Sequence, residues 1–183
     1  MLDRAGGSHG VNLREVARAL GCAHTNAYNY FEDLDDLLAH TLVAVLEQQY
    51  ACSEQALARA GRAPRRRLTA LIESQVDFAL AHPGWYRFVW LEPLRGPPLP
   101  RALAVMKQGG EGIAQLVSEL VGTKISPVRA GEMAEDLHTW LHGALAKAVT
   151  GRVRSSAPAD IRREIASSAR RVCRAITDPD RRR

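Results

Sequence analysis

The chain has 183 residues, of which 46% are hydrophobic and 25% charged, and this composition can bury a sizeable core and excludes a disordered chain. No apolar run approaches the roughly 20 residues of a membrane span, and no signal-peptide core is visible, so we expect a cytoplasmic protein without membrane contact. The cysteines, Cys22, Cys52 and Cys173, are odd in number and far apart. That spacing indicates free thiols and neither a disulfide framework nor a zinc knuckle.

The net charge of +5 suits a nucleic-acid binder, but it is unevenly distributed. Residues 1–40 carry three Arg and six acidic residues, which is three minus six, or −3. The basic excess therefore lies elsewhere, mainly in residues 59–67 and in the last thirty residues. Because an acidic end weakens the attraction to phosphates on which DNA affinity largely depends, we expect a basic stretch to be missing before Met1.

Residues 13–31 predict two short helices joined by a tight turn. Ala17 and Leu20 share one face of the first helix, and Gly21 can adopt the positive φ that ends it without a Cβ clash. Ala17 and Ala27 are small enough to let the two helices cross closely. This pattern is typical of a helix-turn-helix, and the alternative is an ordinary pair of packed helices with a solvated polar face.

The outward face of the second predicted helix is rich in hydrogen-bonding side chains. Asparagine can form two hydrogen bonds with adenine in the major groove, threonine can contact a thymine methyl, and a tyrosine hydroxyl can reach a phosphate oxygen. We therefore predict that this face binds double-stranded DNA. Its residues are His24, Thr25, Asn26, Tyr28, Asn29 and Tyr30.

The TetR family of bacterial transcription regulators has a helix-turn-helix segment that resembles GCAHTNAYNYFEDLDDLL in this chain. The matching residues are Gly21 at the turn, Tyr28 and Phe31 at the end of the recognition helix, and the leucines of 37–38 at the start of a long helix. The resemblance implies DNA contacts by the polar residues above and by Arg14 on the preceding helix.

The chain departs from the family pattern in three places. Leu34 stands where the family commonly has a lysine that meets a phosphate. Ala23 stands where a serine or threonine commonly caps the recognition helix, which forfeits about 1 kcal/mol. The family also begins with a helix packed across the motif, whereas residues 1–12 are glycine-rich and too few to supply it. We therefore expect an incomplete N-terminal helix.

The remaining sequence predicts an all-α fold, because apolar residues recur every three to four positions and no strand pattern is convincing. Asn12 caps the first motif helix, Asp33 caps the long one, and Ser126 followed by Pro127 starts another. Three glycines within 109–112 are expected to bend or break a helix. The helices expected after the motif span about 34–60, 68–80, 101–121, 127–149 and 159–176.

These elements divide into a head and a body. We assign residues 1–45 to a helix-turn-helix DNA-binding domain that is incomplete at its N-terminus. Residues 46–178 form a helical regulatory and dimerisation domain, and residues 179–183 form a basic tail.

Aromatic residues concentrate in and just before the segment HPGWYRFVWLEP. A cluster this dense either fills a core or lines a pocket for a small apolar ligand, and both alternatives stay open. The segment HTWLHG also resembles the tryptophan-histidine-glycine class of TetR-type C-terminal domains, through Trp140, His142 and Gly143. The candidate ligand-binding residues are Phe78, Trp85, Tyr86, Phe88, Trp90, Met106, His138, Trp140 and His142.

His138 and His142 lie one helical turn apart and could face a metal ion, but Thr139 replaces the glutamate of the HExxH pattern. We interpret the two histidines as interior or pocket groups, and we expect no metal, no cofactor and no catalytic residues. A nucleophile and base in recognisable spacing are absent, as is a nucleotide-binding loop. An enzyme is therefore the least favoured function.

The last two predicted helices each carry an apolar stripe. The stripes could form a four-helix interface with a second copy of the chain, or they could pack inside a monomer, and the resemblance favours the homodimer. Their residues are Leu137, Leu141, Ala144, Leu145 and Ala148, and Ile161, Ile165, Ala169, Val172 and Ile176.

These observations predict a DNA-binding transcriptional regulator. We expect a repressor that binds a palindromic operator as a homodimer through its last two helices and is released by a small apolar or amphipathic effector. The alternative is a helical dimerisation and ligand-binding module that has lost DNA binding, as the acidic head and the short N-terminus suggest.

Overall fold

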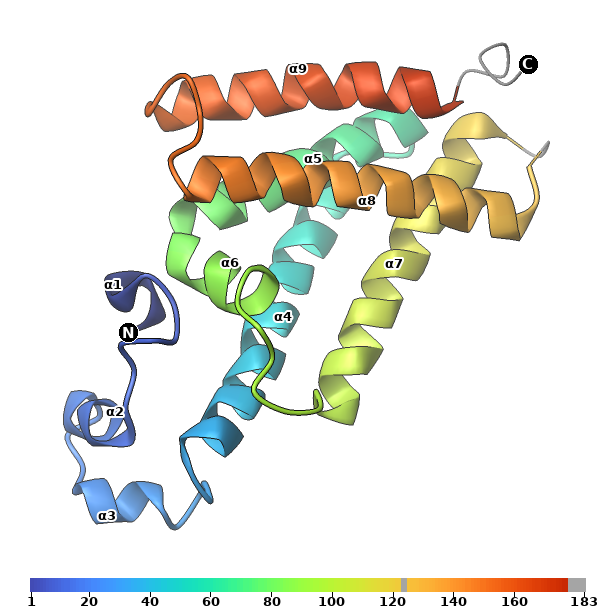
Figure 1. The fold of residues 1–183 in the computed structure, drawn as a ribbon. Helices are drawn as coiled ribbons and strands as arrows, with labels where there is room; N and C mark the ends of the chain where they lie inside the picture. The colour runs from blue at the N-terminus through green and yellow to red at the C-terminus, as the bar shows by residue number, and fades with distance from the viewer. Residues whose placement is uncertain (123–124, 178–183) are drawn as a thin grey trace.

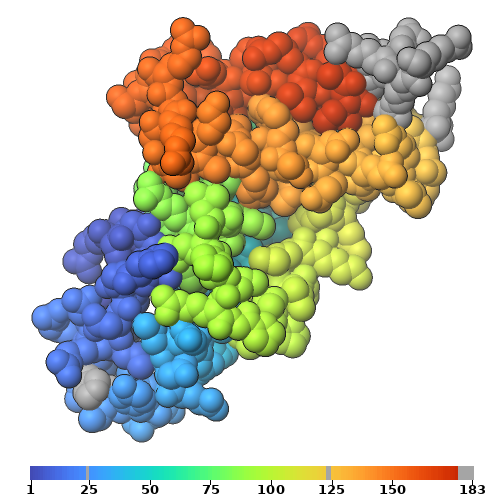
Figure 2. Space-filling model, in the orientation of Figure 1, coloured from blue at the N-terminus to red at the C-terminus, as the bar shows by residue number. Residues whose placement is uncertain are grey.

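The computed structural model describes residues 1–122 and 125–177, without the side chains of His24 and Thr177. Every regular element in these residues is an α-helix, which confirms the predicted all-α fold. The N-terminal helices form a small head at one end, and the later helices form the body (Figures 1 and 2). The basic tail expected over 179–183 lies outside the described residues.

The head contains three short helices, α1 (Leu2–Ala5), α2 (Leu13–Ala19) and α3 (His24–Ala27). Helix α2 begins as predicted, because the side chain of Asn12 accepts a hydrogen bond from the backbone N–H of Glu15 at 2.9 Å. Helix α1 precedes Leu13 and has only four residues, in line with the short N-terminal helix that the sequence predicts. It is held by packing against the body, since four residues are too few to form a stable helix alone.

Helix α4 (Leu34–Arg59) runs from the head into the body and crosses the predicted domain boundary. The side chain of Asp33 caps it by accepting a hydrogen bond from the N–H of Asp36 at 2.9 Å, as predicted. Helix α5 (Pro64–Ala81) then returns alongside α4, and the short helix α6 (Pro83–Trp90) follows it. The long helix therefore provides a continuous connection from the head to the centre of the body.

Helix α7 (Pro100–Val121) is continuous through its three glycines, so of the expected bend or break the break is wrong. Glycine costs a helix only about 1 kcal/mol relative to alanine, and packing against α4, α5 and α8 outweighs that cost. Helix α8 (Pro127–Val149) begins where Ser126 accepts a hydrogen bond from the N–H of Arg129 at 3.2 Å, as predicted. Helix α9 (Pro158–Thr177) lies beside α8 and across α5.

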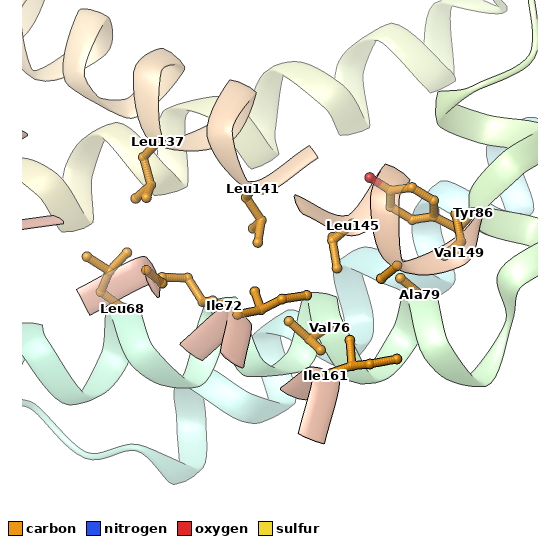
Figure 3. Packing of buried hydrophobic residues seen from close by; sticks show 13 residues of the cluster. Leu68, Ile72, Val76, Ala79, Tyr86, Leu137, Leu141, Leu145, Val149 and Ile161 are labelled. Atoms are coloured by element: carbon orange, nitrogen blue, oxygen red, sulfur yellow. The ribbon is translucent and has the colours of Figure 1, made fainter. Parts of the chain in front are cut away.

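The main core lies where α5, α8 and α9 meet. Figure 3 shows leucines of α8 facing apolar side chains of α5, with Ile161 of α9 beside them. Most of the two predicted stripes is buried here: Leu145 is 1% exposed and Ala169 2%. The stripes therefore pack inside one chain, because α9 closes over α5 and α8. A dimer formed through α8 and α9 would have to use the outer faces of these helices.

Candidate DNA-binding face and ligand cavity

Helices α2 and α3 pack together through the tight turn that the sequence predicts. Gly21 has a φ of 69°, and the N–H of Cys22 donates to the carbonyl of Ala17 at 3.0 Å. Ala17 is only 1% exposed, which fits the close helix crossing expected of a small side chain. Ala23 makes no side-chain cap for α3, as its lack of a polar side chain requires. The local geometry is that of a helix-turn-helix.

The predicted DNA-contacting residues that the structure describes lie on the surface of the head. Arg14, Thr25, Asn26 and Asn29 are exposed, and the side-chain amide of Asn29 donates to that of Asn26 at 2.9 Å. Tyr28 is 53% and Tyr30 75% exposed. The side chain of His24 lies outside the described residues.

Helix α3 is shorter than the resemblance implies. It ends at Ala27, and the next three residues form turns in which the N–H groups of Tyr30 and Phe31 donate to the carbonyl of Ala27. The polar face is therefore built from one helical turn and the chain that follows it. That both parts contact DNA stays a prediction.

A cavity of about 630 Å³ lies in the body between α4, α5, α7 and α8, with Trp90 of α6 on its wall. This volume is in the range of small-molecule sites in proteins. Most of its lining is apolar, and Gly109, Gly110 and Gly112 of α7 line one side. A Cβ added at any of these glycines would meet no atom within 4 Å, so open space lies beside all three.

The structure brings four of the predicted ligand-binding residues to this cavity: Trp90, Met106, His138 and His142. The other predicted residues lie outside its lining. Tyr86 is fully buried in the main core, and Trp140 packs against that core. The rest belong to the apolar cluster shared with α1 and α4; they are Phe78 of α5 and Trp85 and Phe88 of α6.

Sequence reasoning missed the polar residues that α4 and α5 contribute to the cavity. Gln49 and Ser53 are each 5% exposed and fall in the apolar register of α4, and Gln75 falls in that of α5. A polar side chain within an otherwise apolar stripe was the available signal. Such residues are rarely buried without hydrogen-bond partners, so their position in the stripe predicts a polar site.

One polar network connects α6, α4 and α5 along the cavity wall. The indole N–H of Trp90 donates to Gln49 Oε1 at 3.1 Å, and Gln49 Nε2 donates to Gln75 Oε1. Gln75 Nε2 then donates to Ser53 Oγ at 2.6 Å. The network ties three helices to one another beside the cavity.

A second network connects α6 to α8. The hydroxyl of Tyr86 lies 2.7 Å from His142 Nδ1, and His142 Nε2 lies 2.8 Å from His138 Nε2. Burial, with a contribution from nearby His138, lowers the pKa of His142 to about 4, and burial also lowers the pKa of His138. Both imidazoles are therefore neutral at pH 7. The described residues contain no cluster of three or more His, Cys, Asp or Glu side chains placed to hold a metal ion.

The opposite end of α6 is fixed to the N-terminal segment. Asp3 Oδ1 accepts hydrogen bonds from the N–H groups of Gly84 at 2.9 Å and Trp85 at 3.3 Å, so Asp3 caps the helix. A Cβ added at Gly84 would lie 2.2 Å from the carbonyl oxygen of Leu2, so this close approach requires glycine. Helix α6 therefore contacts the N-terminal segment at one end and the cavity wall along its length.

Comparisons with known proteins agree with this architecture. Residues 68–175 match the family described as Tetracyclin repressor-like, C-terminal domain. The HTH-type transcriptional regulator BetI of Burkholderia thailandensis is 32% identical over 154 residues, which is 79% of this chain and 76% of BetI.

Two solved structures share the fold at low sequence identity. A protein of unknown function from Rhodococcus sp. RHA1 has a TM-score of 0.77 at 20% identity, covering 97% of this chain and 93% of that one. The fatty acid degradation regulator FadR from Bacillus halodurans has a TM-score of 0.70 at 14% identity, covering 100% of this chain and 95% of that one.

A helix-turn-helix head joined by a long helix to an all-helical body defines a DNA-binding transcriptional regulator, and the curated relatives are regulators and not enzymes. The chain belongs to the TetR family. No helix in residues 1–122 or 125–177 is long and apolar enough to cross a membrane.

Proposed function

We propose that this regulator is a ligand-responsive repressor. It binds a palindromic operator as a homodimer, and a small apolar or amphipathic molecule in the cavity releases it. The observation that carries this proposal is the double attachment of α6: Asp3 caps its first turn, and Trp90, its last residue, donates to Gln49 on the cavity wall. A ligand that moves α6 would therefore also move the segment that leads into α2.

Release requires that the ligand binds the DNA-free conformation more tightly than the DNA-bound one. A ligand with equal affinity for both conformations would shift nothing. Trp90 belongs to α6, His142 of α8 contacts the ring of Trp90, and both residues line the cavity. A ligand that packs against these two side chains can therefore displace α6. The shift would change the separation of the two recognition helices in the dimer, and so their match to the two half-sites.

The charges on α8 and α9 support pairing through the outer faces of these helices. Exposed residues of α8 include the acidic Asp136, and exposed residues of α9 include Arg170 and Arg171. A twofold axis that sets α8 against the partner's α9 would place opposite charges together. The apolar stripes stay inside each protomer in this arrangement.

The DNA-binding part of the proposal is tested with a fluorescently labelled duplex that carries the promoter upstream of the gene for this protein. Fluorescence anisotropy should show saturable binding by the native chain. The double substitution Asn26→Ala and Asn29→Ala should reduce affinity by at least about tenfold, since a good base-pair contact contributes about 1–3 kcal/mol. Gln55→Ala, at an exposed position of α4 outside the head, is the matched control and should bind as the native chain does. Equal affinity of the double variant would contradict the assignment of this face.

The second candidate function is a ligand-binding and dimerisation module that no longer binds DNA. The observation that favours it is the net charge of −3 over residues 1–40, counted from three Arg and six acidic residues. Absence of promoter binding even at low salt, by a chain that still forms dimers, would select this function over the repressor.

A further inference from the structure

The hydrogen bonds on the cavity wall have a fixed direction on the α4–α5 side. An indole N–H can only donate, so Gln49 must present Oε1 to Trp90 and donate through Nε2 to Gln75. Gln75 in turn donates to Ser53 Oγ, and the Ser53 hydroxyl donates to the backbone carbonyl of Gln49 at 3.1 Å. Each side-chain carbonyl of this network therefore already accepts a hydrogen bond.

Tyr86 fixes the donor-to-acceptor direction of the hydrogen bonds on the α8 side. Its side chain is fully buried, and His142 Nδ1 is the hydrogen-bond partner that the structure gives its hydroxyl. A buried O–H needs an acceptor, so Tyr86 donates to His142 Nδ1. His142 then carries its proton on Nε2 and donates to His138 Nε2, which places the proton of His138 on Nδ1. The neutral imidazoles that burial enforces are consistent with this order.

In both networks the polar groups without a hydrogen-bond partner are N–H donors. Each glutamine amide has a second N–H, and His138 has its Nδ1–H, and none of these has an acceptor among the described residues. Gln49, Gln75 and His138 all line the cavity. The two networks thus offer N–H donors to a ligand, while each of their side-chain carbonyls already accepts one hydrogen bond.

The charged residues around the cavity limit the ligand further. Three carboxylates, on the exposed residues Glu54, Glu111 and Glu135, line its outer part together with one ammonium group, on Lys107, which lies 3.8 Å from the carboxylate of Glu111. An anionic head group would meet more repulsion than attraction there. The donors favour an acceptor, and the carboxylates disfavour a negatively charged one.

We propose that the cavity binds a neutral, mostly apolar molecule whose carbonyl oxygen accepts one or two hydrogen bonds from the free N–H groups of Gln49, Gln75 and His138. This inference rests on the proposed function, because it names the ligand class of the same cavity. Ketones, esters and uncharged amides have this chemistry. Alkyl cations are attracted to the carboxylates but have no acceptor for the N–H donors, and fatty-acid anions carry the disfavoured charge.

The test compares probes of equal chain length that differ in their head group: decan-2-one, decanoate and decyltrimethylammonium. Isothermal titration calorimetry on the full chain should show decan-2-one binding at least about tenfold more tightly than either ion, the equivalent of one or two hydrogen bonds. Equal or weaker binding of the ketone would overturn the ligand class. If the ketone does not bind and promoter binding by the same preparation is intact, the ligand class fails while the DNA-binding function stands.

Substitutions locate the contact on the donor wall. Gln75→Glu replaces one donor with an acceptor of the same shape and should weaken decan-2-one binding about tenfold. His138→Phe keeps a ring of similar size but removes the donor, and it should also weaken binding, so it serves as a second variant if Gln75→Glu does not fold. Gln48→Glu, exposed on α4 outside the cavity lining, is the matched control and should bind normally. Circular dichroism verifies that each variant is folded. Native affinity in both folded cavity variants would overturn the proposal.

Discussion

His142 illustrates how one side chain is controlled by three neighbours. Its ring centroid lies 4.4 Å from that of Trp90 and 4.2 Å from that of His138, and Tyr86 occupies its Nδ1. These contacts remove water from the imidazole, and its pKa therefore falls to about 4. An ordinary histidine in an unfolded chain has a pKa of about 6.5.

This difference predicts a pH-dependent stability. Between pH 4 and about 6.5 the unfolded chain binds a proton that the folded chain does not, so the free energy of unfolding falls as the pH is lowered from 7 to 4. The contribution of His142 to that fall is up to about 3 kcal/mol. Urea denaturation at several pH values should show a shallower fall in His142→Gln, although His138, whose pKa is also lowered, keeps part of it. Thr139→Gln, at an exposed and uncharged position of the same helix, should keep the native profile. An unchanged profile in His142→Gln would contradict this pKa shift.

Single residues were predicted well where their role is local. Asn12, Asp33 and Ser126 each cap a helix as expected, because a cap bonds to an N–H only three residues away. Gly21 closes its turn for the same reason, since the positive φ belongs to one residue. Roles that depend on distant partners, such as that of Gln49, were missed.

Helix α6 depends on contacts from outside itself. A helix of eight residues is not stable in water alone, and neither Pro83 nor Gly84 at its start supplies a side-chain cap. Asp3 provides the missing acceptor from another part of the chain, and its Oδ2 lies 3.0 Å from His82 Nδ1. The element is therefore as much a part of the N-terminal segment as of the body.

Removing that cap should loosen the connection. Asp3→Ala should lower the free energy of unfolding by about 1 kcal/mol, because the first N–H groups of α6 lose their acceptor. Asp3→Asn keeps an acceptor oxygen and should recover most of the loss. Glu32→Ala removes an exposed carboxylate that precedes α4 and serves as the matched control. The measurement is urea denaturation followed by circular dichroism. Equal stability of Asp3→Ala and the native chain would show that the cap contributes nothing.

Helix α7 shows the limit of propensity arguments. Three glycines predicted an interruption, yet the helix continues through them, because the packing of its other residues against α4, α5 and α8 decides its course. The same glycines have a different role in the fold, where they line the cavity. The consequence of these glycines for the fold depends on which helices lie opposite them.

On the scale of the whole molecule, the excess of positive charge lies outside the helix-turn-helix head. The chain carries +5, whereas residues 1–40 carry three Arg against six acidic residues, or −3. One of these acids, Asp35, is paired with Arg95 of the segment between α6 and α7 at 3.1 Å. The head has few cations to meet DNA phosphates, so each one should weigh heavily in the affinity.

Arg14 is the cation that the resemblance implies at the DNA, and it is exposed on α2. Arg14→Ala should weaken promoter binding and reduce the slope of log affinity against log salt concentration by about 1, the value for one lost phosphate contact. Arg66→Ala, exposed on α5 far along the chain from the head, is the matched control and should leave the slope unchanged. Anisotropy titrations at several salt concentrations measure both slopes. Identical slopes for the native chain and Arg14→Ala would place Arg14 away from the phosphates.

The sequence by itself determined the helical class, the bounds of most helices to within a few residues, and the helix-turn-helix with its turn at Gly21. These features depend on side chains within one or two helical turns, where spacing fixes the geometry. Only the tertiary structure decided that the stripes of α8 and α9 lie inside one chain, and that Gln49 and Gln75, and not Phe78 or Trp85, line the cavity. Those outcomes depend on how helices far apart in the sequence face one another, and no local pattern encodes that.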